Sequence, residues 1–523
     1  MTTRLLNYLL AALSGLLLAL SFPKFGHPAF GWVALAPLLV AVYRQPLRRG
    51  FALGLVAGTI YFIGTIYWIT NVMVRYGGLN VFVAVLVNAA LIAYMALFPA
   101  LFALIMARIS VRGGARALWL APMVWVATEY GRAYLFGGFP WVLLGYSQAS
   151  VLPVAQLASL LGVFGVSALV SAVSAAMAYG AVVGLPAASL RTTNATVTAR
   201  PIERFAPLAV VLLVVLSVVF WGSRRIVRGD LTRAGDPIRV GLVQGNVEQA
   251  EKWDDARASS IFANYLRMTR QAIAEGAQVV LWPESSTPFY FEEDRPNADQ
   301  VRRIAREARV PILVGSDQIE HGVPTRYYNS AFLVAPDGSS AGVYRKMHLV
   351  PFGEYVPLKR VLFFAAPLVE AVSDFSPGES AVLLPVKGHL LSTAICYEIV
   401  YPALVRQFTR AGSELLTTIT NDAWFGDTSA PYQHFAQAAM RAIENGRYLV
   451  RSANTGISGI VDPYGRVVVR TDLYKPAVVV EEARFLRGAT VYVRTGDVLA
   501  DAAAVLTAGA LLLTRRKRTL TPA

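Results

Sequence analysis

The stretch LLSTAICYEIV, residues 390–400, contains Cys396, the only cysteine in the 523-residue chain. The residues before this cysteine are mostly apolar or β-branched, and such a run predicts a buried strand. The segment PALVRQFTRAG that follows at 402–412 has helical spacing. We therefore expect Cys396 where a strand ends and a helix begins, and a helix starting there would lower the pKa of its thiol.

Short apolar strands alternate with amphipathic helices on both sides of this stretch, from about residue 238 to residue 482. Such alternation predicts an α/β domain whose helices pack on the faces of its sheets. The predicted helices are 255–275, 297–309, 402–412 and 434–446. The predicted strands are 238–246, 278–284, 311–317, 326–336, 340–346, 389–396 and 415–422, followed by a hairpin around 463–465.

Three chemically reactive side chains close predicted strands. They are Glu284 in QVVLWPE, Lys346 in SAGVYRK and Cys396 in HLLSTAIC. Active sites of α/β folds lie at the carboxyl ends of strands, so the three groups can converge. A thiolate can attack an acyl carbonyl, a carboxylate can move the thiol proton, and an ammonium can stabilise the resulting oxyanion. The three residues are therefore a sufficient set for acyl transfer.

Each of these residues also has a purely structural interpretation. A lone cysteine on a strand most often packs in the core. Glu284 could be a loop acid or a helix N-terminal carboxylate, and Lys346 could protect an edge strand from aggregation. Their common position at strand ends favours one catalytic site over three unrelated structural residues.

The region before Asp230 is too apolar for a soluble domain. The whole chain is 55% hydrophobic and only 15% charged, whereas about a quarter of the residues in soluble proteins are charged. Glu129 and Glu203 are the only acidic residues before Asp230. Apolar runs of about 20 residues can cross a bilayer. We expect about eight such spans, at 5–21, 28–43, 51–72, 80–107, 117–135, 153–185, 206–222 and 497–514.

Lys and Arg in short loops predict the orientation of membrane spans. With eight spans, every basic cluster falls on one side, which this rule assigns to the cytoplasm. We expect a multi-pass membrane protein with both termini in the cytoplasm and the α/β domain on the opposite side of the membrane. The net charge of +15 then reflects topology, and no nucleic-acid motif is visible. The predicted domains are a membrane domain of about seven helices at 1–222, a catalytic domain at 223–490, and a last span with a basic tail at 491–523.

One ionisable pair interrupts the fifth apolar run. Glu129 and Arg132 are one helical turn apart, and charges within a membrane span are costly unless they are paired. Such a pair is often functional, but we expect the two side chains to neutralise each other near the membrane interface.

Several motifs resemble those of a known family. WPES at 282–285, YRKMHLVPFGEYVP at 344–357 and CYE at 396–398 resemble the Glu–Lys–Cys motifs of the nitrilase superfamily. Together with the predicted spans and WVATEYGRAYLFGGFPW at 125–141, they resemble the apolipoprotein N-acyltransferases, a membrane-embedded branch. The resemblance implies a polytopic α-helical membrane domain of about eight spans plus an α/β, nitrilase-like αββα sandwich domain.

The resemblance also implies roles for individual residues. Glu284 would be the general base, Lys346 the oxyanion stabiliser and Cys396 the nucleophile. The positions that match supporting roles are Glu354, Tyr397 with its backbone N–H as an oxyanion donor, Glu398, and Trp253 for substrate access.

The reaction implied by the resemblance is a ping-pong acyl transfer in the bilayer. An acyl chain would pass from a phospholipid, phosphatidylethanolamine in the family, to the cysteine as a thioester. It would then pass to the N-terminal amine of a diacylated apolipoprotein. One alternative is a membrane-tethered nitrilase-type amidase that uses water as acceptor, since both reactions pass through a thioester. Another is a transporter or scaffold whose α/β domain only binds.

We expect no cofactor, no nucleic-acid partner and a monomer. The five histidines form no cluster with metal-ligand spacing, so we expect no metal site. His348 and His434, the histidines nearest the motifs, are expected to be structural.

Overall fold

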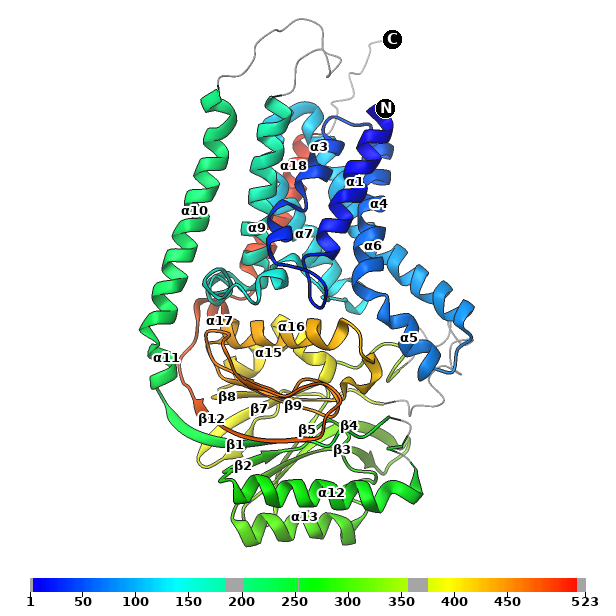
Figure 1. Cartoon of the computed structure of the whole chain (residues 1–523), viewed down its shortest axis with the longest axis vertical. Helices are drawn as coiled ribbons and strands as arrows, with labels where there is room; N and C mark the ends of the chain where they lie inside the picture. Colours follow the sequence, from blue (N-terminus) through cyan, green and yellow to red (C-terminus); the bar gives the residue numbers. More distant parts are fainter. Residues whose placement is uncertain (1–2, 185–200, 250, 253, 356–374, 515–523) are drawn as a thin grey trace, which may run out of the picture. The chain divides into compact units, whose positions relative to one another are not determined.

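The structure, a computed structural model, describes residues 3–184, 201–249, 251–252, 254–355 and 375–514. Contacts within the chain separate two compact units (Figure 1). The first unit contains Met1–Tyr67, Leu86–Arg225 and Asp497–Ala523, and the second contains Trp68–Val85 and Ile226–Gly496.

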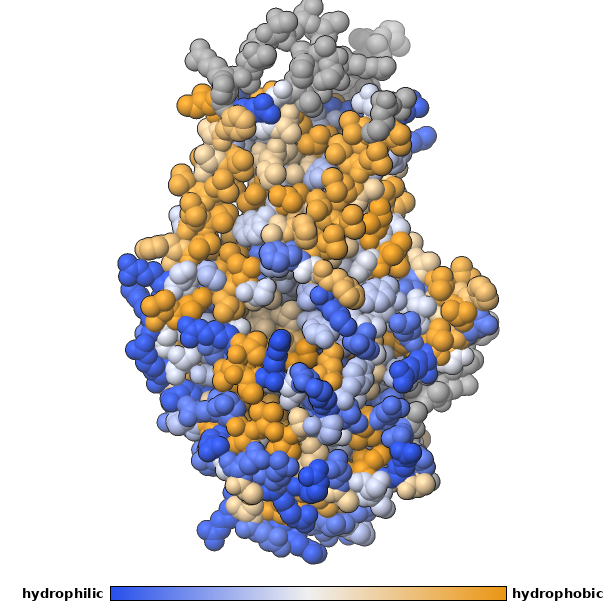
Figure 2. Space-filling model, viewed as in Figure 1, coloured by the Kyte–Doolittle hydropathy of each residue, from blue (hydrophilic) through white to orange (hydrophobic). Residues whose placement is uncertain are grey.

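The first unit is built from apolar helices, and each of the eight predicted apolar runs carries at least one of them. Figure 2 shows hydrophobic residues gathered over the surface of these helices. Large side chains such as Leu16, Leu86, Leu213 and Leu506 are exposed there. The helices are α1 (Thr3–Ala19), α2 (Ala29–Val33), α3 (Ala36–Val42), α4 (Leu47–Ile66), most of α6 (Val81–Gly113), α7 (Ala121–Tyr134), α8 (Leu152–Ala155), α9 (Ala158–Val183), most of α10 (Pro201–Arg228) and α18 (Val498–Leu513).

Among the described residues, four helical stretches are long and apolar enough to cross a membrane: Leu47–Ile66, Val81–Gly137, Ala158–Val183 and Arg204–Arg233. The stretch Val81–Gly137 covers two of the predicted runs. The helices in three other runs are shorter, Thr3–Ala19, Ala29–Val42 and Val498–Leu513. The apolar helical region is therefore confirmed, and the number of spans stays a prediction.

The ion pair expected in this unit is present on α7. Glu129 and Arg132 are both buried, and their charged groups lie 3.9 Å apart. The Leu144 N–H donates to Oε1 of Glu129 at 2.6 Å, and Nη1 of Arg132 donates to the Trp141 carbonyl at 2.6 Å. The pair therefore also fastens the irregular segment 141–144 to α7.

The second unit contains two six-stranded sheets. The first has the order β12-β1-β2-β3-β4-β5 and the second β11-β10-β9-β8-β7-β6. The strands are β1 (Asp236–Gln244), β2 (Val279–Leu281), β3 (Ile312–Glu320), β4 (Arg326–Val334), β5 (Ser340–Arg345), β6 (Leu384–Val386), β7 (His389–Ile395), β8 (Leu415–Thr420), β9 (Leu449–Ala453), β10 (Gly459–Val461), β11 (Val467–Arg470) and β12 (Ala477–Phe485).

The two sheets face each other between two layers of helices, as Figure 1 shows. Contacts of β1 with β9 and of β4 with β7 join the sheets. The helices of this unit are α5 (Trp68–Arg75), α11 (Asp230–Arg233), α12 (Asp255–Ala274), α13 (Arg295–Ala308), α15 (Pro402–Arg410), α16 (Ala430–Asn445) and α17 (Val491–Thr495). The predicted αββα sandwich is confirmed.

Local sequence explains where the helices of the first sheet begin and which face they bury. The carboxylates of Asp254 and Asp294 accept N–H groups of the first turns of α12 and α13, which caps both helices. On α13, Val301, Ile304 and Ala305 lie on one buried face, as their spacing predicts. These residues join a core centred on the fully buried Trp282.

The predicted hairpins β4–β5 and β10–β11 are present, but three strands were missed. The sequence analysis placed no strand at β6, β9 or β12. β12 pairs with β1 along its whole length, from Asp236 with Phe485 to Gln244 with Ala477. That pairing joins segments more than 230 residues apart, which a local pattern does not indicate.

The segment Trp68–Val85 belongs to the second unit because its aromatic residues pack on the turn after β8. The Tyr76 hydroxyl donates to the Ala423 carbonyl at 2.9 Å, and its ring lies 5.0 Å from that of Trp424. The Trp68 ring lies 4.9 Å from that of Phe425. The chain between two apolar runs thus contacts the α/β fold.

Replacing the buried Trp282 should destabilise the second unit strongly. Its ring stacks on Tyr265 at 5.0 Å, and its Nε1–H donates to Thr269. We expect Trp282→Ala to lower the free energy of unfolding by about 3–5 kcal/mol. Val468→Ala, on the exposed edge strand β11, should change it by less than about 0.5 kcal/mol. Denaturant unfolding of the purified protein in detergent measures both, and equal effects would contradict this core assignment.

Candidate active site

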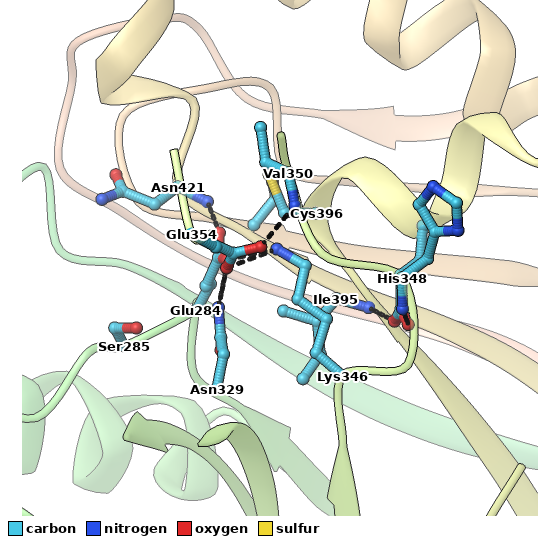
Figure 3. Close-up of polar contacts among 12 residues, drawn as sticks. Glu284, Ser285, Asn329, Lys346, His348, Val350, Glu354, Ile395, Cys396 and Asn421 are labelled. Atoms are coloured by element: carbon cyan, nitrogen blue, oxygen red, sulfur yellow. Dashed lines mark hydrogen bonds and ion pairs between the residues drawn. The ribbon is translucent and has the colours of Figure 1, made fainter. Parts of the chain in front are cut away.

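The reactive residues from both sheets lie in one buried cluster. Lys346 directly follows β5, Cys396 directly follows β7, and Glu284 lies three residues after β2. All three side chains are almost completely buried. Figure 3 shows them converging, with Glu354 and Asn329 beside them.

Lys346 is held between two carboxylates. Its Nζ lies 2.9 Å from Oε1 of Glu354 and 3.3 Å from Oε1 of Glu284. Burial alone would lower the pKa of Lys346, but the two carboxylates outweigh burial and raise the pKa above its usual range. The ammonium therefore stays charged at any physiological pH, as a group that stabilises an oxyanion must.

Asn329 on β4 joins the two carboxylates from the other side. Its Nδ2 donates to Oε1 of Glu284 at 2.8 Å and to Oε1 of Glu354 at 2.9 Å. The Val350 N–H holds the second oxygen of Glu354 at 2.8 Å. Each carboxylate is thus fixed at both oxygens, since the Asn421 N–H donates to Oε2 of Glu284 at 2.8 Å.

Glu284 is ionised at neutral pH in this surrounding. Burial alone would raise its pKa, but the Lys346 ammonium and the Asn329 and Asn421 donors lower the pKa below the usual value. An ionised carboxylate next to a thiol can act as a general base.

The conformation of Cys396 is unusual. Its φ is +51°, a left-handed conformation that non-glycine residues adopt only when the surrounding structure enforces it. A short 3₁₀ turn, Cys396–Val400, separates the end of β7 from α15. The expected helix does not begin beside the cysteine but at Pro402, one turn later.

The expected lowering of the thiol pKa was wrong. Burial raises the pKa of Cys396 well above its usual value, and the Glu284 carboxylate raises it further, while Lys346 opposes these effects only in part. The N-terminus of α15 does not compensate, because this helix starts farther along the chain. The resting Cys396 side chain is therefore a neutral thiol.

Glu398 joins the loop that carries Lys346 to β7, the strand that ends at Cys396. Its Oε1 accepts from the Tyr344 hydroxyl at 2.8 Å and from the N–H groups of Met347 and His348 at 2.7 and 3.0 Å. Its Oε2 accepts from the Ile395 N–H at 2.7 Å. Burial nevertheless raises the pKa of Glu398 to about 7. This side chain sets where Lys346 and Cys396 lie relative to each other.

The other sequence-predicted residues have different outcomes. Tyr397 is buried, and its ring lies 5.2 Å from that of Tyr401 and 6.0 Å from that of His348. Trp253 lies outside the described residues, so its role in substrate access stays a prediction.

Sequence reasoning missed Asn329, Asn421 and Lys252. The Lys252 side chain is buried, and its Nζ lies 3.4 Å from the Glu284 carbonyl. A polar residue inside an apolar strand, as Asn329 is in RYYNSAFLV, was the available signal, because buried amides need partners. No sequence pattern indicates the hydrogen bond from Asn421 to Glu284, since its donor is a backbone N–H.

Comparisons with known proteins place both parts of the chain. Residues 14–176 match the family described as "Apolipoprotein N-acyltransferase N-terminal domain", and residues 239–484 match "Carbon-nitrogen hydrolase". Proteins named apolipoprotein N-acyltransferase are similar along nearly the whole chain. The one from Geobacter metallireducens is 41% identical over 98% of this chain and 96% of its own. Those from Azotobacter vinelandii and Methylococcus capsulatus are 36% and 34% identical, over 98% and 94% of this chain and 96% and 92% of their own.

Glu398 should make stability depend on pH. Its pKa of about 7 in the folded protein exceeds the unfolded value of about 4.5, so folding favours the protonated form. The stability that this group contributes is present at low pH and is lost as the pH rises through 7. Between pH 4.5 and 7.5, the unfolding free energy of the wild type relative to Glu398→Gln should fall by about 3 kcal/mol.

Unfolding of both proteins across this pH range measures the difference. A difference that stays constant or grows with pH would show that the four donors, rather than burial, control the pKa of Glu398.

Proposed function

Because the chain belongs to the apolipoprotein N-acyltransferase family, we propose that it completes lipoprotein maturation. It transfers an acyl chain from a membrane phospholipid to the N-terminal amine of an S-diacylglyceryl-cysteine apolipoprotein. Phosphatidylethanolamine is the proposed donor, and no cofactor is needed to exchange an ester for a thioester and then for an amide. The buried cluster of Glu284, Lys346 and Cys396 carries this proposal.

In the first half of the reaction, Glu284 takes the proton of Cys396 as Sγ attacks the ester carbonyl of the phospholipid. The high pKa of the thiol supports proton transfer during the attack rather than before it. The Lys346 ammonium and the Tyr397 N–H stabilise the oxyanion. The lysophospholipid leaves as an alkoxide that takes the proton from Glu284, and the acyl group stays on sulfur as a thioester.

In the second half, the α-amine of the apolipoprotein attacks the thioester. Glu284 takes a proton from the attacking amine, and the same donors stabilise the second oxyanion. The C–S bond breaks, Cys396 receives the proton from Glu284, and the triacylated lipoprotein leaves with a new amide.

Glu354 supports both halves by keeping Lys346 charged. When Glu284 carries a proton, the ammonium keeps its 2.9 Å contact with Glu354. The cation therefore persists while the base changes its charge, because one of its two carboxylates never takes part in proton transfer.

The membrane unit anchors the enzyme where both substrates reside. A soluble enzyme would have to extract each acyl chain from the bilayer, at about 0.8 kcal/mol per CH₂ group. We propose that the enzyme is a monomer of the bacterial inner membrane, with the catalytic unit in the periplasm and both termini in the cytoplasm. The proposed domains are 1–222, 223–490 and 491–523.

Cys396 should accumulate an acyl group when only the donor is present. Purified protein incubated with phosphatidylethanolamine should gain one acyl chain on Cys396, visible by intact mass and peptide mass spectrometry. Addition of a diacylated lipopeptide should then remove the acyl chain from the protein and acylate the peptide amine. Cys396→Ala and Glu284→Gln should lower the rate on the order of 10³-fold or more.

Two outcomes separate the alternatives. Release of free fatty acid without acylated peptide would identify a hydrolase that uses water. A wild-type protein that forms neither the thioester nor the acylated peptide, and whose binding is unchanged by Cys396→Ala, would support a unit that only binds. Matched unfolding midpoints of the variants and the wild type exclude misfolding as the cause of lost activity.

A further inference from the structure

His434 lies directly behind the nucleophile, on α16, and is completely buried. Its Nε2 lies 3.2 Å from the carbonyl oxygen of Cys396. A carbonyl only accepts hydrogen bonds, so Nε2 must carry the proton that this contact uses.

Two charged residues fix the ring of His434 from its other side. Its Nδ1 lies 3.1 Å from Oδ1 of Asp422 and 3.1 Å from Nη2 of Arg451. Asp422 and Arg451 pair with each other at 2.7 Å, and both are almost completely buried. Burial and the Arg451 guanidinium lower the pKa of His434, so the ring is neutral. With its proton on Nε2, the ring accepts at Nδ1 from Arg451, and Asp422 acts on the ring through its ion pair with Arg451.

Burying Asp422, Arg451 and His434 costs desolvation free energy that stability alone does not explain. A buried ion pair and a buried imidazole require each other as partners, and an apolar core of the same volume would serve stability equally well. Nothing in the proposed reaction uses these three side chains directly. His434 contacts the nucleophile through its hydrogen bond to the Cys396 carbonyl.

We propose that His434 is a positioning residue that aims the Cys396–Tyr397 peptide, and this proposal rests on the proposed function. The carbonyl of Cys396 and the N–H of Tyr397 belong to one planar trans peptide and point in opposite directions. Fixing the carbonyl on the His434 side therefore directs the N–H, the proposed oxyanion donor, to the opposite side. The carbonyl that His434 holds belongs to a residue whose φ is +51°.

The loop after β8 connects this support to the general base. Thr420 and Asp422 are joined by a hydrogen bond of 3.0 Å. Asn421, between them, donates its N–H to Glu284. The three consecutive residues thus hold the base directly and the nucleophile through His434, so both are placed by one rigid turn.

Two amide substitutions separate a positioning role from a structural one. The side-chain amide nitrogen of a glutamine, Nε2, lies near the position of the histidine Nε2. The side-chain amide nitrogen of an asparagine, Nδ2, lies near the position of the histidine Nδ1. His434→Gln keeps a donor for the Cys396 carbonyl and should form the thioester within about 5-fold of the wild-type rate. His434→Asn loses that donor and should slow thioester formation about 10–100-fold. This loss is smaller than that caused by removing an oxyanion donor itself, because the Tyr397 N–H is misdirected rather than absent. The KM for phosphatidylethanolamine should stay within about 2-fold in both.

His389 provides matched control variants. It lies at the start of the same strand, β7, with Nδ1 2.7 Å from Glu414 and its ring stacked on Phe485. His389→Gln and His389→Asn make the same side-chain changes on the same strand, away from the Cys396 carbonyl, and should leave the thioester rate unchanged.

Thioester formation at the wild-type rate in His434→Asn would overturn the proposal. So would equal losses in both His434 variants that follow their unfolding midpoints. A wild-type protein that forms no thioester would instead contradict the proposed function.

A second measurement does not depend on acyl transfer. Nitrogen-15 NMR of the full-length protein labelled at histidine should show a neutral ring protonated at Nε2 whose signal disappears in His434→Gln. A ring protonated at Nδ1 would overturn the proposal even if the enzyme were inactive.

Discussion

The ammonium of Lys346 between Glu284 and Glu354 is the interaction on which the site depends. Charges removed from water are stable only with close partners and satisfied hydrogen bonds. One cation between two carboxylates leaves an excess of negative charge, which Asn329 and two backbone N–H groups share. Burial and, after it, the Glu284 carboxylate raise the pKa of the neighbouring Cys396 thiol and keep it protonated. The carboxylate and the thiol are therefore coupled electrostatically before any substrate binds.

Two further carboxylates, those of Glu398 and Asp422, fix the positions of the residues in this cluster. Glu398 binds N–H groups of the Lys346 loop and of β7, so a single side chain joins the Lys346 loop to the strand that ends at Cys396. Asp422 acts on the opposite side, through Arg451 and His434. Glu284, Lys346 and Cys396 follow different strands of two sheets, and these buried hydrogen bonds hold them in place.

The two units differ in how their buried charged side chains are paired. In the α/β unit, buried charges lie in groups of both signs, such as Lys346 with Glu284 and Glu354, and Asp422 with Arg451. In the helical unit, Glu129 and Arg132 are the only buried charged side chains among the described residues. Glu129 and Arg132 are accommodated only because each also binds the backbone of the segment 141–144.

Local sequence was enough to predict the apolar helices, most strands and the three reactive residues. Strand and helix periods act over a few residues, and a polar side chain that ends an apolar strand is visible without any structure. Tertiary contacts decided the rest. The pairing of β12 with β1, the Asn329 bridge and the Asn421 N–H on Glu284 join residues far apart in the chain.

The direction of the thiol pKa shift was also beyond the sequence. The sequence by itself determined that a cysteine, a glutamate and a lysine close strands of an α/β domain attached to apolar helices. Only the tertiary structure decided that Cys396 is a neutral thiol with a left-handed backbone, backed by His434. Desolvation and backbone strain depend on which groups pack around an atom, and the sequence near Cys396 does not contain most of those groups.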